Sequence, residues 1–198
     1  IDTKEKDMLY LMRHGQTDWN IVHKLQGRTD IPLNENGRQM AKEACKTYQN
    51  IKIDKCFCSP LQRARETAEL MLERRNIPIE MDDRLQEMSF GAFEGEENIF
   101  DKPDHPMFTL FKKPADYVAC EGAEKLEELF ARTGKFMREV VIPELQNGKD
   151  VLIVGHGAMN LSIINRVYDV AMEDFWERLP GNCQMVELPV DLVLERFR

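Results

Sequence analysis

Two hydrophobic runs, at positions 8–15 (MLYLMRHG) and 151–157 (VLIVGHG), each end abruptly at a histidine followed by glycine. Neither run alternates with polar residues, a pattern typical of a strand buried in the middle of a parallel sheet with helices on both faces. Open α/β sheets bind their ligands at the carboxyl ends of such strands. We therefore predict that His14 and His156 face each other across that edge and hold a phosphoryl group.

Segments between these runs alternate between strand and helix patterns. Apolar residues recur at helical spacing in several stretches, and shorter apolar stretches are bounded by turn residues. This alternation predicts an α/β protein: a three-layer sandwich with a mostly parallel central sheet flanked by helices. We predict a helical turn at 16–20 and helices at 34–50, from near Ser59 onward, at 123–141 and at 157–168. The helix at 123–141 is closed by Pro143 and by Asn147-Gly148. Besides the two hydrophobic runs, strands are predicted at 54–59, 79–85 and 183–188.

The helix that begins near Ser59 has a complete N-terminal signal. Ser59 is a favourable N-cap, Pro60 suits the first helical position, and Gln62 stands where a capping box needs it. We expect its buried face to consist of Ala64, Ala68, Met71 and Leu72.

Residues 96–120 differ from the rest of the chain, because they hold three prolines and several lysines without a sustained period. A long stretch of this kind in a compact domain is usually a lid or a binding loop. We therefore predict one domain over residues 1–198 with a lid-like insertion at about 96–120.

Composition narrows the classes of partner. The chain is 42% hydrophobic and 31% charged with a net charge of −8, which argues against a nucleic-acid or anionic-membrane partner. No apolar run is long enough to span a bilayer, and residues 1–7 lack the features of a secretion signal. We expect a cytoplasmic protein that binds a small phosphorylated substrate; a homodimer stays open.

The five cysteines include no CxxC pair, which favours a reducing compartment. Cys56 and Cys58 alternate along a predicted strand and should point to one face as small hydrophobic residues, with metal or redox chemistry as the minor alternative.

Phosphoryl transfer needs a nucleophile, donors around three phosphoryl oxygens, and a proton for the leaving oxygen. A histidine has a free nitrogen lone pair near neutral pH, so His14 can be the nucleophile. The adjacent Gly15 would let the backbone approach a ligand, and Arg13 could donate charge-assisted hydrogen bonds.

Arg63 follows the first turn of the predicted Ser59 helix, whose N-terminus is partly positive. A second guanidinium there would strengthen an anion site. The alternative is an ordinary solvated arginine paired with Glu66 or Glu69.

Glu87 and Glu94 are the candidates for the proton donor. Glu87 directly follows a predicted strand beside Met88 and Phe90, and partial burial raises the pKa of a carboxylate. Glu94 stands beside Gly95 and suits a turn equally well.

The chain resembles the histidine phosphatase superfamily, in its branch of cofactor-dependent phosphoglycerate mutases and related phosphatases. Five ordered segments carry the resemblance: LMRHGQTDWN at 11–20, QG…PLNENG at 26–37, SPLQRARETA at 59–68, residues 84–95, and GHG at 155–157.

The resemblance implies roles for individual residues. His14 matches the phosphorylated histidine, and Glu87 matches the proton donor that later activates water. Three further positions match residues around the phosphoryl group: Arg13, Arg63 and His156. Asn20 and Gln26 match polar positions that line the phosphate site of the family. We add Gly27 and Gly157 to the predicted substrate-binding residues. The resemblance also implies that no metal or other cofactor is needed.

The chain departs from the mutases in its insertion, which holds no arginine where mutases have several. Lys112 and Lys113 are candidate contacts to a charged substrate, although two exposed lysines are more often only solvated. We therefore expect a phosphomonoesterase of the histidine acid phosphatase type, which acts on a small metabolite through a phosphohistidine. The alternatives are a cofactor-dependent phosphoglycerate mutase and a non-catalytic binding or regulatory protein.

Overall fold

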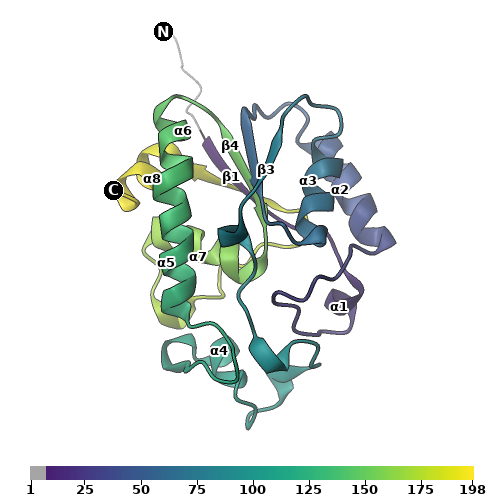
Figure 1. Cartoon of the computed structure of the whole chain (residues 1–198), viewed down its shortest axis with the longest axis vertical. Helices are drawn as coiled ribbons and strands as arrows, with labels where there is room; N and C mark the ends of the chain where they lie inside the picture. The colour runs from purple at the N-terminus through teal and green to yellow at the C-terminus, as the bar shows by residue number, and fades with distance from the viewer. Residues whose placement is uncertain (1–7) are drawn as a thin grey trace.

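The computed structural model describes residues 8–198, so the expectation for residues 1–7 lies outside the described residues. Five strands form one sheet in the order β3-β2-β4-β1-β5, in which only β5 runs antiparallel to its neighbour (Figure 1). The strands are β1 (Met8–Arg13), β2 (Lys55–Cys58), β3 (Ile79–Met81), β4 (Val151–Gly155) and β5 (Met185–Pro189).

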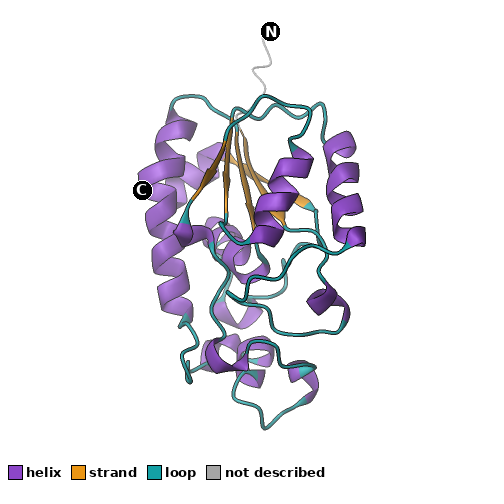
Figure 2. Cartoon of the chain, turned by 45° about the vertical axis from the view of Figure 1, so that its right-hand side comes forward, coloured by secondary structure: helices purple, strands orange, loops and turns teal. Residues whose placement is uncertain are grey.

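Helices cover both faces of this sheet (Figures 1 and 2). They are α1 (Asp18–Ile21), α2 (Glu35–Thr47), α3 (Gln62–Met71), α4 (Phe108–Lys112), α5 (Leu126–Phe136), α6 (Ile142–Gln146), α7 (Gly157–Tyr168) and α8 (Val190–Arg196), with short helical turns η1 (Asp83–Leu85), η2 (Gly91–Phe93), η3 (Ile99–Asp101), η4 (Pro114–Asp116) and η6 (Met172–Asp174) and a π-helical segment η5 (Met137–Val141).

Alternate residues of each central strand enter different cores. Leu9 and Leu11 of β1 pack with α5, α7 and α8, whereas Tyr10 and Met12 pack with α2 and α3. Cys56 and Cys58 are buried on the α2–α3 face, which confirms that they share one side. The three-layer α/β sandwich is therefore confirmed.

Two predicted elements are wrong in extent. The strand predicted over 79–85 ends at Met81, because the Asp82 side chain accepts a hydrogen bond from the Arg84 N–H and turns the chain into η1. The long helix predicted over 123–141 begins at Leu126 and is not closed by Pro143: it continues through the π-helical segment η5 to Gln146, where Asn147 caps it, so the predicted Asn147-Gly148 closure is confirmed.

The segment 96–120 lies beyond the carboxyl edge of the sheet, where Figure 1 shows α4. Several contacts fix it to the body of the protein, among them the following two. Lys24 and Glu97 form an antiparallel bridge, and the Trp176 Nε1–H donates to the Leu110 carbonyl at 2.7 Å. Its description as a lid within a single domain stays a prediction.

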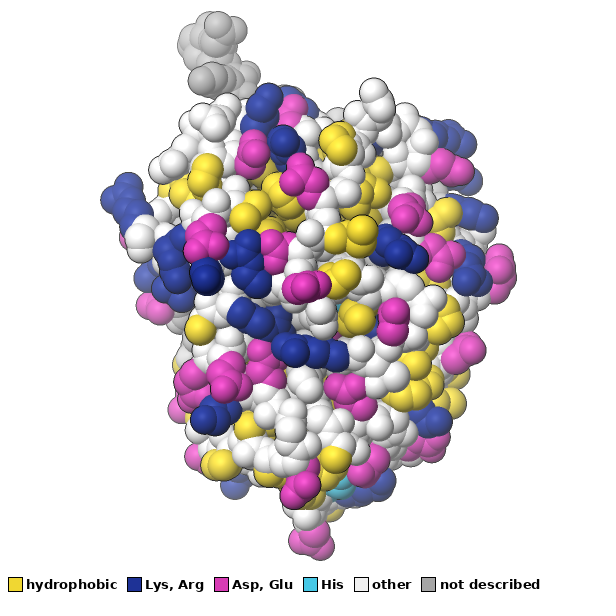
Figure 3. Space-filling view, viewed as in Figure 1, with side chains coloured by type: hydrophobic (Ala, Val, Ile, Leu, Met, Phe, Trp, Pro, Cys, Tyr) yellow, Lys and Arg dark blue, Asp and Glu magenta, His cyan; other side chains and the backbone are white. Residues whose placement is uncertain are grey.

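Charges of both signs are interspersed over the face shown in Figure 3, without a continuous basic surface. Within residues 8–198, no helix is long and apolar enough to cross a membrane.

Candidate active site

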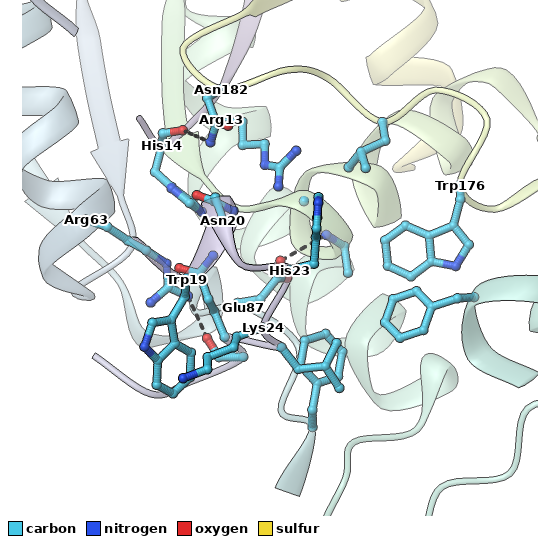
Figure 4. Close-up of a pocket in the computed structure, with 18 of the residues that line it drawn as sticks. Arg13, His14, Trp19, Asn20, His23, Lys24, Arg63, Glu87, Trp176 and Asn182 are labelled. Atoms are coloured by element: carbon cyan, nitrogen blue, oxygen red, sulfur yellow. Dashed lines mark hydrogen bonds between the residues drawn. The ribbon is translucent and has the colours of Figure 1, made fainter. Parts of the chain in front are cut away.

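A cavity of about 400 Å³ opens beside the carboxyl ends of β1 and β4 (Figure 4). Its inner part brings together residues from β1, α3, the segment after β3, and the start of α7. Eight residues predicted from the sequence line it: Arg13, His14, Asn20, Gln26, Gly27, Arg63, Glu87 and Gly157.

His14 stands where β1 ends, and its backbone N–H still donates to Gly155 of β4. Its Nδ1 lies 2.7 Å from the Gly15 carbonyl, which can only accept a hydrogen bond. Nδ1 therefore carries the hydrogen, and Nε2 keeps its lone pair. Burial, followed by the charges of Arg63 and Arg13, holds the pKa of His14 well below its usual value. The ring is thus an uncharged base at neutral pH.

His156 lies fully buried behind the cavity, with its ring centroid 5.2 Å from that of His14. The two histidines therefore face each other as predicted. His156 Nε2 lies 2.7 Å from the Ser59 hydroxyl, whereas its buried Nδ1 has no partner among the described residues. Burial and then Arg63 hold the pKa of His156 well below its usual value. An unpartnered nitrogen is what a ligand oxygen at this place would satisfy.

Arg63 is almost completely buried, which rules out the alternative of a solvated helix arginine. Its Nη1 and Nη2 donate to the carbonyls of Thr29 and Gly27 at 2.8 and 2.6 Å, while its buried Nε has no partner among the described residues. Burial lowers its pKa to about 10, so it stays charged at neutral pH. Arg13 likewise has an unpartnered buried Nε, and its Nη1 donates to the Pro180 carbonyl at 3.1 Å.

Three backbone N–H groups hold the Glu87 carboxylate. Met88 and Met159 donate to Oε1 at 2.8 and 2.9 Å, and Ala158 donates to Oε2 at 3.1 Å. Two of these donors belong to the first turn of α7, which therefore places the carboxylate at the wall of the cavity.

Glu94 is used differently. Its oxygens accept hydrogen bonds from the backbone N–H groups of Arg28, Thr29 and Phe90 and from the Thr29 hydroxyl. It therefore fastens the 27–29 loop and does not line the cavity.

Asn20 and Gln26 are oriented by Thr17. The Thr17 N–H donates to Asn20 Oδ1 at 3.0 Å, and the Thr17 hydroxyl donates to Gln26 Oε1 at 2.9 Å. Because both amide oxygens are used, the NH₂ groups remain as donors at the cavity.

The Arg132–Glu124 pair supports the Glu87 segment from behind. The Arg132 guanidinium donates to Glu124 and also to the carbonyls of Arg84, Gln86 and Glu87. Sequence reasoning did not identify this pair, since the two residues belong to a different segment from the one they support.

Two sequence predictions do not hold at the site. Lys112 and Lys113 are exposed and do not line the cavity, because α4 directs Phe111 there instead. Ser59 is not the N-cap of α3, which begins at Gln62; the Ser59 hydroxyl accepts the Leu61 N–H and lies 2.7 Å from His156 Nε2. Gly15 is required for packing, since a Cβ there would lie 2.6 Å from the Gly37 carbonyl oxygen, and its role in the approach of a ligand stays a prediction.

The other residues that line the cavity were not predicted: Trp19, His23, Lys24, Leu25, Phe90, Phe100, Phe111, Ala158, Trp176, Leu179 and Asn182. The outer part of the cavity, away from His14, contains Trp176 (Figure 4) and the apolar side chains around it. The aromatic residues within 90–111 were the available signal, because such residues in a polar insertion indicate a binding surface. Asn182 also fixes the inner site, since its Nδ2 donates to the His14 carbonyl at 2.8 Å. Within residues 8–198, no group of three or more His, Cys, Asp and Glu is placed to hold a metal ion.

Residues 9–192 match the histidine phosphatase superfamily (branch 1). The chain belongs to this family. It is 37% identical over 158 residues to the uncharacterized phosphatase PhoE of Bacillus subtilis, covering 79% of this chain and 75% of that protein. It is 30% identical over 154 residues to a 2,3-bisphosphoglycerate-dependent phosphoglycerate mutase of Gloeobacter violaceus, covering 76% and 70%.

Among solved structures, the chain is similar to a mycobacterial glucosyl-3-phosphoglycerate phosphatase in complex with VO3. The TM-score is 0.81 at 27% identity, and the match covers 92% of each chain. The superfamily thus includes phosphatases and phosphoglycerate mutases similar to this chain, and their fold is the one described above.

Proposed function

We propose that the protein hydrolyses a phosphomonoester of a small metabolite through a phosphohistidine intermediate on His14. The observation that carries this proposal is the state of the His14 ring, an uncharged base whose Nε2 is free between two guanidinium groups. The phosphatases among its relatives support the same reaction class.

In the first step, His14 Nε2 attacks phosphorus, and the bond from phosphorus to the alcohol oxygen breaks. Glu87 gives its proton to that oxygen, so the alcohol leaves neutral. The Nε groups of Arg13 and Arg63 and the Nδ1 of His156 have no partner among residues 8–198, and they supply hydrogen bonds or charge to the transferring group.

In the second step, water attacks phosphorus and gives a proton to Glu87, while the bond from Nε2 to phosphorus breaks. Inorganic phosphate leaves, and both His14 and Glu87 return to their starting states. No residue outside the cavity and its immediate support is needed for this cycle.

The test is to trap the phosphoenzyme with a labelled substrate. Wild type should give an acid-labile, base-stable phosphoprotein, and His14→Ala should lose both label and turnover. His156→Ala should keep some of each, since it removes stabilisation and not the bond-forming atom. Equal labelling of wild type and His14→Ala would refute the assignment.

The similarity to a phosphoglycerate mutase favours that activity as the second candidate. A mutase would convert 3-phosphoglycerate to its isomer when primed with bisphosphoglycerate, whereas a phosphatase would release inorganic phosphate. Absence of both reactions across a wide panel of phosphomonoesters would favour a binding or regulatory role.

A further inference from the structure

One side of the cavity is an aromatic wall formed by Phe90, Phe100, Phe111 and Trp176. Phe111 is at its centre, with ring centroids 4.8 Å from Phe100, 5.1 Å from Trp176 and 6.1 Å from Phe90. Phe100 and Leu179 are each 40% exposed although they line the cavity. Apolar side chains left in water beside a binding site indicate an apolar ligand group that covers them.

This wall is held in place before any ligand enters. The Trp176 indole N–H donates to the Leu110 carbonyl at 2.7 Å. The Trp176 and Phe175 rings pack edge to face, with their centroids 4.9 Å apart. The segment that carries Phe111 is therefore tied to the segment that carries Trp176. Because these side chains are already ordered, binding of a ligand to the wall does not have to offset the loss of their conformational entropy.

Positive charge is concentrated at the other end of the cavity. Of the arginines and lysines that line it, Arg13 and Arg63 stand beside His14, and Lys24 lies beside Trp19 (Figure 4). Lys24 Nζ is 3.5 Å from a Glu97 carboxylate oxygen and 5.5 Å from the centre of the Trp19 ring, so its charge is already partnered. The lining therefore offers no unpaired lysine or arginine to a second anionic group of a substrate.

We propose that the preferred substrates are monoesters whose alcohol carries an apolar, aromatic group a few atoms from the ester oxygen, and that esters with a second anionic group are disfavoured. This inference rests on the proposed phosphatase function and identifies its substrate class. Figure 4 shows Trp176 well separated from His14 and Arg63, which leaves room between them for the body of such an alcohol.

The test compares three primary alkyl phosphates that share one ester chemistry: propyl phosphate, 3-phenylpropyl phosphate and 3-carboxypropyl phosphate. We expect kcat/KM for the phenyl compound to exceed that for propyl phosphate by about tenfold or more, as burial of a phenyl group predicts, and the carboxylate compound to be the poorest. Equal values, or a preference for the carboxylate, would overturn the inference while leaving the phosphatase proposal in place.

Variants locate the preference. Trp176→Ala should bring the phenyl and propyl values close together, and Phe111→Leu should reduce the ratio less. Tyr168→Ala is the matched control, because Tyr168 is a partly exposed aromatic residue that does not line the cavity, and the ratio should not change. An unchanged ratio in Trp176→Ala would contradict the assignment of this wall.

A binding measurement on the wild-type protein separates the two proposals. Titration calorimetry with butylphosphonate and 4-phenylbutylphosphonate, which cannot be hydrolysed, should show about tenfold tighter binding of the phenyl compound. Tight binding of the phenyl compound without hydrolysis of any phosphate would overturn the phosphatase proposal and support the ligand class. No difference in binding would overturn the ligand class, whatever is hydrolysed.

Discussion

Two uncharged histidines are buried beside two arginines, and this arrangement has a thermodynamic consequence. The pKa values of His14 and His156 both lie well below 6.5, so the folded protein binds no proton on either ring where the unfolded chain does. Stability must therefore fall as the pH decreases below about 6.5.

We expect the free energy of unfolding to fall by about 1.4 kcal/mol per pH unit for each of the two rings, between about pH 6.5 and the lower pKa values of the folded state. Urea unfolding at several pH values across this window measures the slope. The double variant His14→Asn, His156→Asn should lose most of the slope; a variant as steep as wild type would contradict the buried, uncharged state.

Glu87 and Glu94 lie in one segment but have different surroundings, and leaving-group dependence separates them. A general acid matters most for a poor leaving group, so Glu87→Gln should slow the first turnover of an alkyl phosphate by roughly 10² to 10⁴ and that of p-nitrophenyl phosphate much less. Rapid-quench measurement of the first turnover is required, because Glu87 also serves the second step.

Glu94→Gln is the control for this comparison. It loosens the 27–29 loop and should affect both substrates alike. If Glu94→Gln discriminates between the substrates and Glu87→Gln does not, Glu94 is the proton donor.

For single residues, the sequence predicted the position of most side chains at the inner end of the cavity. Arg13, His14 and Glu87 could be predicted because they belong to short segments that end a strand or follow one. Charge alone was a poor guide, as Lys112 and Lys113 show. Adjacent residues of one helix point in different directions, so the apolar Phe111 lines the cavity while its charged neighbours face solvent.

The N-terminus of α3 is capped by a residue from a distant loop. Asp30 Oδ1 accepts the Gln62 N–H at 2.8 Å, and the Gln62 side chain donates back to the Asp30 carbonyl at 2.8 Å. This reciprocal pair does what the local Ser59 signal was expected to do.

Asp30→Ala should destabilise the protein by about 1 kcal/mol, the usual cost of a lost cap, and should weaken competition by vanadate because Arg63 follows in the same turn. Thermal unfolding and inhibition by vanadate measure the two effects. Ser59→Ala should instead leave the cap intact and act through His156, so an equal loss of helix stability in both variants would contradict this division.

Local sequence signals could not reveal these element boundaries. The serine, proline and glutamine of the Ser59 segment fit a cap equally well in isolation, and only the tertiary position of Asp30 decides the matter. Pro143 similarly indicates a helix end, but the helix continues through it after a π-helical segment, a feature that hydrophobic periodicity does not predict.

At the scale of the whole molecule, Arg132 connects helix α5, on one face of the sheet, to the segment that carries Glu87. Its guanidinium donates to the Glu124 carboxylate and to three backbone carbonyls of one segment, those of Arg84, Gln86 and Glu87. Glu124 is buried, and Arg132 is its closest charged partner, with Arg28 farther away at 3.6 Å.

Arg132→Met should therefore destabilise the protein by about 3 kcal/mol, because it removes the closest cation from a buried carboxylate and leaves only Arg28 at 3.6 Å and the Ser89 N–H as its partners. Chemical denaturation measures this loss. The double variant Arg132→Met, Glu124→Leu should recover part of the stability, and failure to recover any would show that the carbonyl contacts, not the charge pair, carry the effect.

The aromatic wall could be predicted from the sequence only in part. Aromatic residues within 90–111 indicate a binding surface, but Trp176 comes from a separate region and alone is an ordinary hydrophobic residue. Only the fold packs the segment 96–120 against the chain after α7 at the same cavity that holds His14.

Both tryptophans of the chain, Trp19 and Trp176, line this cavity. All tryptophan fluorescence of the protein therefore comes from the walls of this cavity. The Trp19 ring lies beside the Lys24 ammonium, and the Trp176 ring lies within the aromatic wall. The intrinsic fluorescence of the unlabelled protein is thus a local probe: a ligand that fills the outer cavity must alter the surroundings of an emitting ring. Occupancy can be followed in real time, with no added dye, in the same sample that turns over.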